Sequence, residues 1–213
     1  MMGLRRRRLL LRRILIVTTA VVLVLGIVLG AVWWFSPLRR ANERVQALRE
    51  ATLPDYITAD FIPTVGTARS GQALADFNGV VIHYVGNPAT SAAANRNYFA
   101  KVGTTVVSHF VVGLDGEVIQ CLPLWERSVA SNNRNKDTIS IEVCHPDDSG
   151  QFNAATYDAV VRLTAWLCRV GDLTTEQVIR HYDVSGKECP RYYVRNEGAW
   201  QQFLTDVHDE INK

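Results

Sequence analysis

Residues 80–84 of the chain read VVIHY, and this run decides the fold. Its β-branched side chains are typical of a strand that is buried on both faces, and Gly86 helps to end it. The sequence then predicts a helix over residues 91–102. It also predicts a β-hairpin made by residues 106–112 and 117–122, because an Asp-Gly pair between them supplies the positive φ angles of a tight turn.

Strands and helices continue to alternate after the hairpin. Residues 138–144 read TISIEVC, and this alternation of polar and aliphatic side chains predicts a strand with one buried and one open face. An amphipathic helix over residues 153–168, a strand over 177–182 and a terminal helix over 200–211 follow. The fold class is therefore α/β, with a single mixed central β-sheet flanked by helices in residues 72–213, enough chain for one core.

The amino terminus predicts one transmembrane helix before this domain. Residues 14–35 carry no charged side chain, and a helix of 22 residues can cross the roughly 30 Å hydrocarbon core. Residues 1–13 hold six arginines, against Arg39 and Arg40 just beyond the helix, so we expect a cytoplasmic basic tip. A cleaved signal peptide is the alternative. Its apolar region is usually about 7–15 residues long and ends at small side chains, whereas this segment ends in Trp-Trp-Phe.

Residues 36–71 are expected to form an extracytoplasmic stalk or linker. Apolar side chains recur there at three- and four-residue steps, which indicates a short helix: Leu38, Ala41, Val45 and Leu48. The rest of the segment is irregular and contains Pro and Gly. The folded domain is then expected to begin near Gln72.

The charge distribution argues against a nucleic-acid partner. The 213 residues contain 23 basic and 21 acidic side chains, for a net charge of +2. Six of the basic side chains lie in residues 1–13, so the remainder is mildly acidic, with 17 basic against 21 acidic groups. A nucleic-acid-binding domain instead concentrates Lys and Arg on one face. The hydrophobic content of 47% also excludes disorder over most of the length.

Three side chains that can ligate a metal lie where strands run into loops. His83 ends the first predicted strand, while His181 and Cys189 lie on either side of the loop formed by residues 182–188. Zinc binds imidazole and thiolate, and three protein ligands leave a fourth position for water, which is the catalytic arrangement. The alternative is that each histidine at a strand end has a structural role, since no spacing rule links His83 to His181.

Four segments resemble one enzyme family. VVIHY (80–84), SHFVVGLDGEVIQ (108–120), TISIEVCHP (138–146) and IRHYDVSGKECP (179–190) occur in the order found in the zinc-dependent N-acetylmuramoyl-L-alanine amidases. This family includes phage amidase-type lysozymes and peptidoglycan recognition proteins. The resemblance covers residues 72–203, and its last segment is the most specific.

The resemblance implies a zinc amidase domain over residues 72–213. Its zinc ligands match His83, His181 and Cys189, and its reaction is hydrolysis of the amide between N-acetylmuramic acid and the L-alanine of the stem peptide. Lys187 matches the family lysine that can stabilise the developing oxyanion. Glu142 matches the glutamate that some catalytic branches use as the general base. The implied partner is peptidoglycan.

The chain also departs from the phage branch. Ser108 stands where those enzymes are expected to carry a catalytic tyrosine before His109-Phe110, which moves the proton-transfer role towards Glu142. His109 is interpreted either as a group close to the zinc ligands or as a buried, hydrogen-bonded side chain. Residues 132–135 have amide and guanidinium groups suited to a peptide carboxylate or sugar hydroxyls, but they are equally a plain turn.

The other cysteines favour free thiols. If Cys189 binds zinc, Cys121, Cys144 and Cys168 form an odd set, so at most one disulfide is expected among them. All three lie in predicted strands or on an apolar helical stripe, so buried free thiols are the simpler interpretation.

The sequence thus predicts a single-pass protein of the cell membrane with a cytoplasmic N-terminus and an extracytoplasmic hydrolase domain. The alternative is a muropeptide-binding module without catalysis, but such a module would be expected to have replaced Cys189. A zinc peptidase is disfavoured because the chain has no HExxH motif. Gly26 and Gly30 form a Gly-x-x-x-Gly pattern, which permits helix dimerisation without requiring it.

Overall fold

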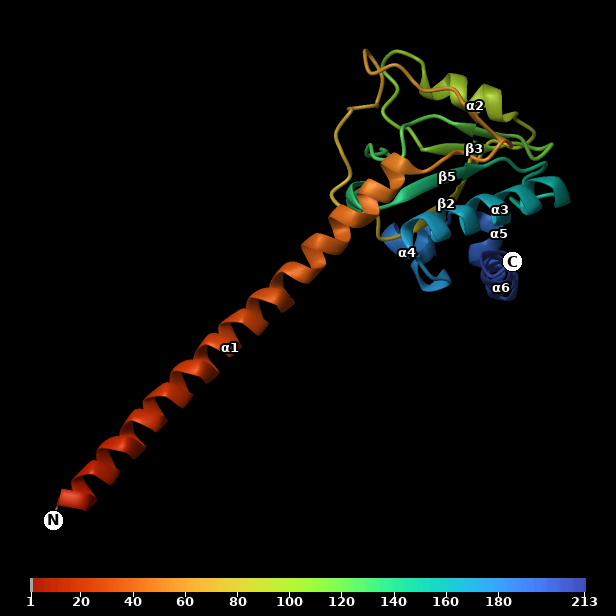
Figure 1. Ribbon diagram of the computed structural model, residues 1–213. Helices are drawn as coiled ribbons and strands as arrows, with labels where there is room; N and C mark the ends of the chain where they lie inside the picture. The colour runs from red at the N-terminus through yellow and green to blue at the C-terminus, as the bar shows by residue number, and fades with distance from the viewer. Residues whose placement is uncertain (1) are drawn as a thin grey trace. The chain divides into compact units, whose positions relative to one another are not determined.

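The computed structural model describes residues 2–213, and its contacts divide the chain into two units, Met1–Arg40 and Ala41–Lys213. Helix α1 (Met2–Glu50) contributes to both (Figure 1). Within the first unit, the segment Leu11–Trp33 is 23 residues long with a mean hydropathy of 2.8, and the side chains described there are exposed. By length and composition this segment can cross a membrane, although a signal sequence near an N-terminus meets the same criterion.

The second unit begins earlier than the sequence predicts. Leu48, in the last turns of α1, is only 1% exposed and packs in the main core. Strand β1 (Ile57–Ala59) pairs in parallel with β4 (Val118–Gln120), and Ile62 is fully buried. The expected stalk over residues 36–71 is therefore corrected, since the segment from Ala41 onward belongs to the folded unit.

The unit is built on one six-stranded sheet with the strand order β1-β4-β3-β5-β2-β6. Its other strands are β2 (Val80–Tyr84), β3 (Phe110–Val112), β5 (Ile139–Val143) and β6 (Val178–Arg180). Only β3 and β4 pair antiparallel, as the hairpin predicted, and the other four pairings are parallel. The sheet is mixed and helices flank it, which confirms the predicted fold class.

The two faces of the sheet have separate cores. On one face, Val80, Ile82, Ile139 and Ile141 pack with α3 (Ala154–Gly171) and α6 (Glu197–Ile211) in the larger cluster. The opposite face holds a smaller cluster under α2 (Ala92–Phe99). Figure 1 shows α3, α5 (Arg191–Arg195) and α6 on one side of the sheet and α2 on the other.

Local sequence explains the boundaries of α3. The Asn153 side chain accepts a hydrogen bond from the Thr156 N–H at 2.9 Å, which satisfies one of the free donors of the first turn. At the other end, a Cβ on Gly171 would come within 2.4 Å of the Phe77 ring. Glycine is required there because the helix end and the core meet without room for a side chain.

The segment after β6 differs from the prediction. The expected strand over residues 177–182 ends at Arg180, and His181–Ser185 forms the short helix α4 rather than an irregular loop. Gly186 has a φ of +75° and ends α4, its N–H donating to Tyr182 O at 2.8 Å. A further short helix, α5 (Arg191–Arg195), and the 3₁₀ turns η1 (Asn132–Lys136) and η2 (Thr175–Gln177) complete the elements.

Candidate metal centre

The register of three parallel strands brings the predicted ligands together. His83 on β2 pairs with Glu142 on β5, and Ile82 pairs with Arg180 on β6, so the next residues, His83 and His181, are neighbours. Their ring centroids are 4.6 Å apart. The Cys189 thiol completes a group of three ligand atoms that all lie within 4.8 Å of one another. The three side chains, which are 106 positions apart at most in the chain, form one buried cluster.

The hydrogen bonds of the two imidazoles leave one nitrogen of each ring for a ligand. Nε2 of His83 lies 3.0 Å from Ser131 Oγ, and Nε2 of His181 lies 2.9 Å from Asn132 Oδ1. Nδ1 of His181 is buried without a hydrogen-bond partner. Such an orphaned polar atom is costly unless something binds it. Two imidazoles, one of which has an unpartnered Nδ1, and a thiol form a donor set that fits zinc.

Burial sets the protonation of this cluster. It lowers the pKa of His83 well below the ordinary value, helped by the His181 ring and the Lys187 cation, and it lowers the pKa of His181 together with Lys187. Both rings are therefore neutral at pH 7, as metal ligation requires. Burial, reinforced by Glu142, raises the pKa of the Cys189 thiol to about 12, so the binding of a cation would displace its proton.

Glu142 lies beside the cluster on β5. Its Oε1 is 3.9 Å from Nδ1 of His83, its side chain is 18% exposed, and its Oε2 is buried without a hydrogen-bond partner. Burial raises the pKa of the Glu142 carboxyl to about 8, while Lys187 acts in the opposite direction. A carboxyl whose pKa lies near neutrality can both take up and release a proton.

The five predicted site residues line one pocket of about 220 Å³. They are His83, Glu142, His181, Lys187 and Cys189. Lys187 is exposed and lies between Gly186, where α4 ends, and Cys189. Asn95 and Tyr98 of α2 and Val106 form other parts of the lining. The pocket therefore combines ligand atoms, a carboxyl and an ammonium with an opening to solvent.

His109 is a buried, hydrogen-bonded side chain, which is one of the two interpretations that the sequence allows. Its Nδ1 accepts the Ser140 N–H at 3.1 Å, and its Nε2 lies 2.8 Å from the carbonyl oxygen of Glu126. Ser108 is also buried and donates to Ser140 O at 2.8 Å. The polar face of β5 was predicted to be open, but these contacts cover Ser140 completely.

Ser131 and Asn132 are the residues that sequence reasoning missed. The sequence predicts either substrate contact or a plain turn for residues 132–135. In the structure Ser131 and Asn132 contact His83 and His181, which lie 48 and 49 positions away in sequence. Pairings of this range carry no local sequence signal. Cys121, Cys144 and Cys168 meet the prediction of buried free thiols, because all three are unbridged and buried.

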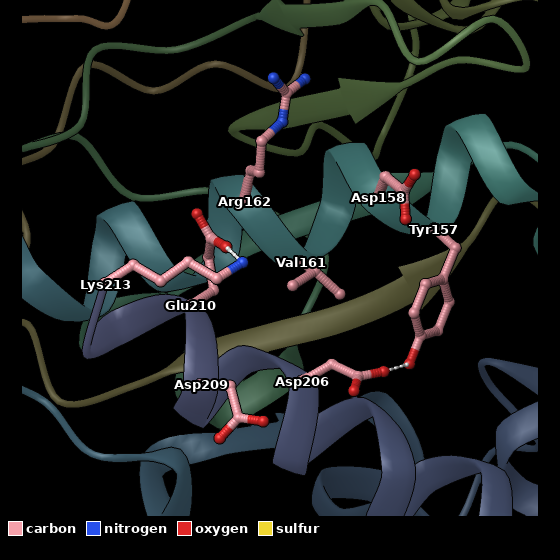
Figure 2. Close-up of a pocket in the computed structure, with 8 residues that line it drawn as sticks. All are labelled: Tyr157, Asp158, Val161, Arg162, Asp206, Asp209, Glu210 and Lys213. Carbon is pink, nitrogen blue, oxygen red and sulfur yellow. Dashed lines mark hydrogen bonds and ion pairs between the residues drawn. The ribbon is translucent and has the colours of Figure 1, made fainter.

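A second pocket, of about 780 Å³, lies between α3 and α6 and has no histidine or cysteine in its lining (Figure 2). Carboxylates dominate it: Asp158, Asp206, Asp209 and Glu210. Tyr157 donates a hydrogen bond to Asp206, and Lys213 pairs with Glu210 at 2.7 Å (Figure 2). These partners already use part of the acidic surface.

Comparisons with known proteins agree on one kind of domain. A family model described as N-acetylmuramoyl-L-alanine amidase matches residues 73–192. The amidase XlyA of Bacillus subtilis (strain 168) is 34% identical over 161 residues, which cover 71% of this chain and 50% of XlyA. The amidase CwlL of Bacillus licheniformis is 29% identical over 170 residues, covering 71% of this chain and 46% of CwlL.

A solved structure supports the same match in three dimensions. The catalytic domain of XlyA aligns with a TM-score of 0.60 at 30% identity, covering 71% of this chain and 98% of that structure. The chain spans about half the length of the curated relatives it matches.

Proposed function

This chain belongs to the N-acetylmuramoyl-L-alanine amidase family, and we propose that it hydrolyses the amide between N-acetylmuramic acid and L-alanine in peptidoglycan. His83, His181 and Cys189 would hold a zinc ion. The observation that carries the proposal is the approach of these three ligand atoms to within 4.8 Å in a pocket that also contains Glu142 and Lys187.

Each of the other side chains has a role in this chemistry. A bound zinc ion supplies Lewis-acid polarisation of the scissile carbonyl and lowers the pKa of the attacking water. Glu142 would accept the proton of that water and deliver it to the leaving amide nitrogen, a role for which its place beside His83 and its unpartnered Oε2 suit it. Lys187 stabilises the negative charge that develops on the carbonyl oxygen.

The first unit would tether this activity to the membrane. The segment Leu11–Trp33 has the length and hydropathy of a membrane span. Four arginines precede it and two more lie at its start, against Arg39 and Arg40 beyond its end, so the positive-inside bias favours a cytoplasmic N-terminus. The hydrolase domain would then face the cell wall, where its substrate lies.

The test is digestion of purified peptidoglycan by the full chain in detergent, with and without a chelator, followed by mass spectrometry of the soluble products. We expect stem peptides that begin with a free L-alanine amine, and we expect the chelator to stop their release. Cys189→Ser should lose both bound zinc and product release, while the matched control Cys168→Ala, in α3, should keep both. Binding to the wall without any release would instead indicate a recognition module.

A further inference from the structure

One loop contacts both candidate imidazole ligands. Ser131 and Asn132 are consecutive in the chain, and their side-chain oxygens lie 3.0 Å from Nε2 of His83 and 2.9 Å from Nε2 of His181. In both rings this contact occupies Nε2. The other nitrogen, Nδ1, lies 3.9 Å from Glu142 Oε1 in His83 and has no hydrogen-bond partner in His181. The loop therefore meets both rings on the side away from the candidate metal position.

We propose that Ser131 and Asn132 are positioning residues that fix the tautomer and orientation of His83 and His181, so that Nδ1 of each ring is the metal-binding atom. This inference rests on the proposed function, because it concerns the same metal centre. It extends that function to two residues outside the predicted site.

The hydrogen-bonding chemistry of Asn132 determines the tautomer of His181. An amide oxygen can only accept a hydrogen bond. Nε2 of His181 must therefore carry the proton, and its N–H donates a hydrogen bond to Asn132 Oδ1. In a neutral imidazole the other nitrogen, Nδ1, then has a free lone pair. This Nδ1 is the buried atom that lacks a partner in the protein.

Ser131 plays the equivalent part for His83. Its side chain is completely buried, so its hydroxyl is held against the ring and shielded from exchange with water. A hydroxyl can accept the Nε2 proton, which leaves Nδ1 of His83 facing the cluster. Hydrogen bonds of this kind to the second ring nitrogen orient ligand histidines and raise their basicity.

The loop itself is held in place by its own side chains. Asn135 Oδ1 accepts the N–H groups of Ala130 and Ser131 at 3.0 and 2.6 Å, and Arg134 N–H donates to Ser131 O at 2.9 Å. Asn132 has a φ of +54°, in the left-handed region that asparagine tolerates better than most residues. The two contacts to the imidazoles therefore come from an ordered turn.

The experiment measures zinc affinity of the full chain in detergent, by competition with a chromophoric chelator. We expect Ser131→Ala and Asn132→Gly each to weaken zinc binding by about 10- to 100-fold. Glycine at 132 keeps the positive φ angle and removes the side-chain amide, including its acceptor oxygen. Asn133→Ala, an exposed position in the same turn, is the matched control and should bind zinc like the wild type.

Two further measurements separate positioning from misfolding. Asn132→Asp retains an acceptor oxygen and should recover zinc affinity to within about threefold of the wild type, below the 10-fold loss expected when such a partner is removed. With cobalt at saturation, the visible spectrum of Ser131→Ala should differ from that of the wild type, because the ring orientation changes at the metal.

The outcomes distinguish this inference from the function on which it rests. A wild-type chain that retains no zinc would overturn both. A wild-type chain that binds zinc and releases stem peptides, together with Ser131→Ala and Asn132→Gly variants of unchanged affinity and cobalt spectrum, would overturn the positioning role alone.

Discussion

Glu142 is the residue whose environment decides whether the pocket can perform hydrolysis. It faces the ligand cluster from β5, with one carboxylate oxygen near His83 and the other buried and unused by the protein. The three candidate zinc ligands alone would suit either a binding module or an enzyme. A buried carboxyl beside them adds the capacity to move a proton.

We predict that Glu142→Gln lowers turnover by about 10²- to 10⁴-fold and leaves zinc content unchanged, because the amide keeps the shape of the side chain but cannot accept a proton. The measurement is stem-peptide release, paired with zinc analysis of the same sample. Glu176→Gln, at an exposed position in η2, is the control and should behave like the wild type. Full activity of Glu142→Gln would assign the base to another group.

His109 makes the stability of the domain depend on pH. Its Nδ1 already accepts the Ser140 N–H, so a proton added there would oppose another donor. Burial lowers the pKa of His109 to about 4. At pH values between about 4 and the ordinary pKa of 6.5, His109 binds a proton in the unfolded chain but not in the folded chain. The stability contribution is therefore complete above pH 6.5 and is lost as the pH falls towards 4.

We predict that this residue accounts for about 2 kcal/mol of the loss in unfolding free energy between pH 7.5 and pH 5. Urea titration at the two pH values should show that the unfolding free energy of His109→Gln falls by about 2 kcal/mol less than that of the wild type. His208→Gln, at an exposed position on α6, should retain the slope of the wild type. Equal slopes for His109→Gln and the wild type would contradict the assignment.

Among the elements, those with regular hydrophobic patterns were predicted best. The β-branched run of β2 and the amphipathic stripe of α3 determine their elements locally, and both appear where the sequence predicted them. The antiparallel pairing of β3 and β4 followed from the turn between them. In these cases the information lies in a few neighbouring residues.

The elements that were predicted poorly depend on distant contacts. The three residues of β1 become a strand because β4 provides an edge 61 positions later, and Leu48 is buried because the domain packs around it. The convergence of His83, His181 and Cys189 likewise follows from strand order. Their residue types at predicted strand ends suggested the set and the resemblance to a family supported it, but no spacing in the sequence links the three positions.

The end of α1 and strand β1 should therefore be essential to the fold. A chain that begins at residue 72 loses Leu48, Ile57 and Ile62 from the two cores. Removing one large buried aliphatic side chain typically costs about 2–5 kcal/mol, against a total stability of about 5–15 kcal/mol. We predict that residues 41–213 unfold cooperatively on heating, whereas residues 72–213 show no such transition by circular dichroism.

A point substitution checks the same conclusion without truncation. Leu48→Ala in residues 41–213 should lower the unfolding free energy by about 2–5 kcal/mol. Val65→Ala, at a side chain that is 85% exposed, should change it by less than about 0.5 kcal/mol. A stable chain that begins at residue 72 would restore the stalk boundary inferred from the sequence.

For the whole molecule, the proposed role of the first unit is to hold the hydrolase domain at the membrane. We predict that the full chain remains in the membrane pellet after an alkaline carbonate wash and that its intact mass includes the N-terminal arginines. Residues 41–213 should appear in the supernatant, because they lack the apolar segment Leu11–Trp33. A mature mass that lacks this segment would show that it is a cleaved signal sequence.

The pairing of His83 with Glu142 across β2 and β5 has a consequence for divergence within such a family. Their separation is determined by the spacing of about 4.8 Å between neighbouring strands, and loop conformation does not alter it. Insertions or exchanges in the segments around the pocket rim would therefore change which substrates the pocket admits and leave His83 and Glu142 at the same separation.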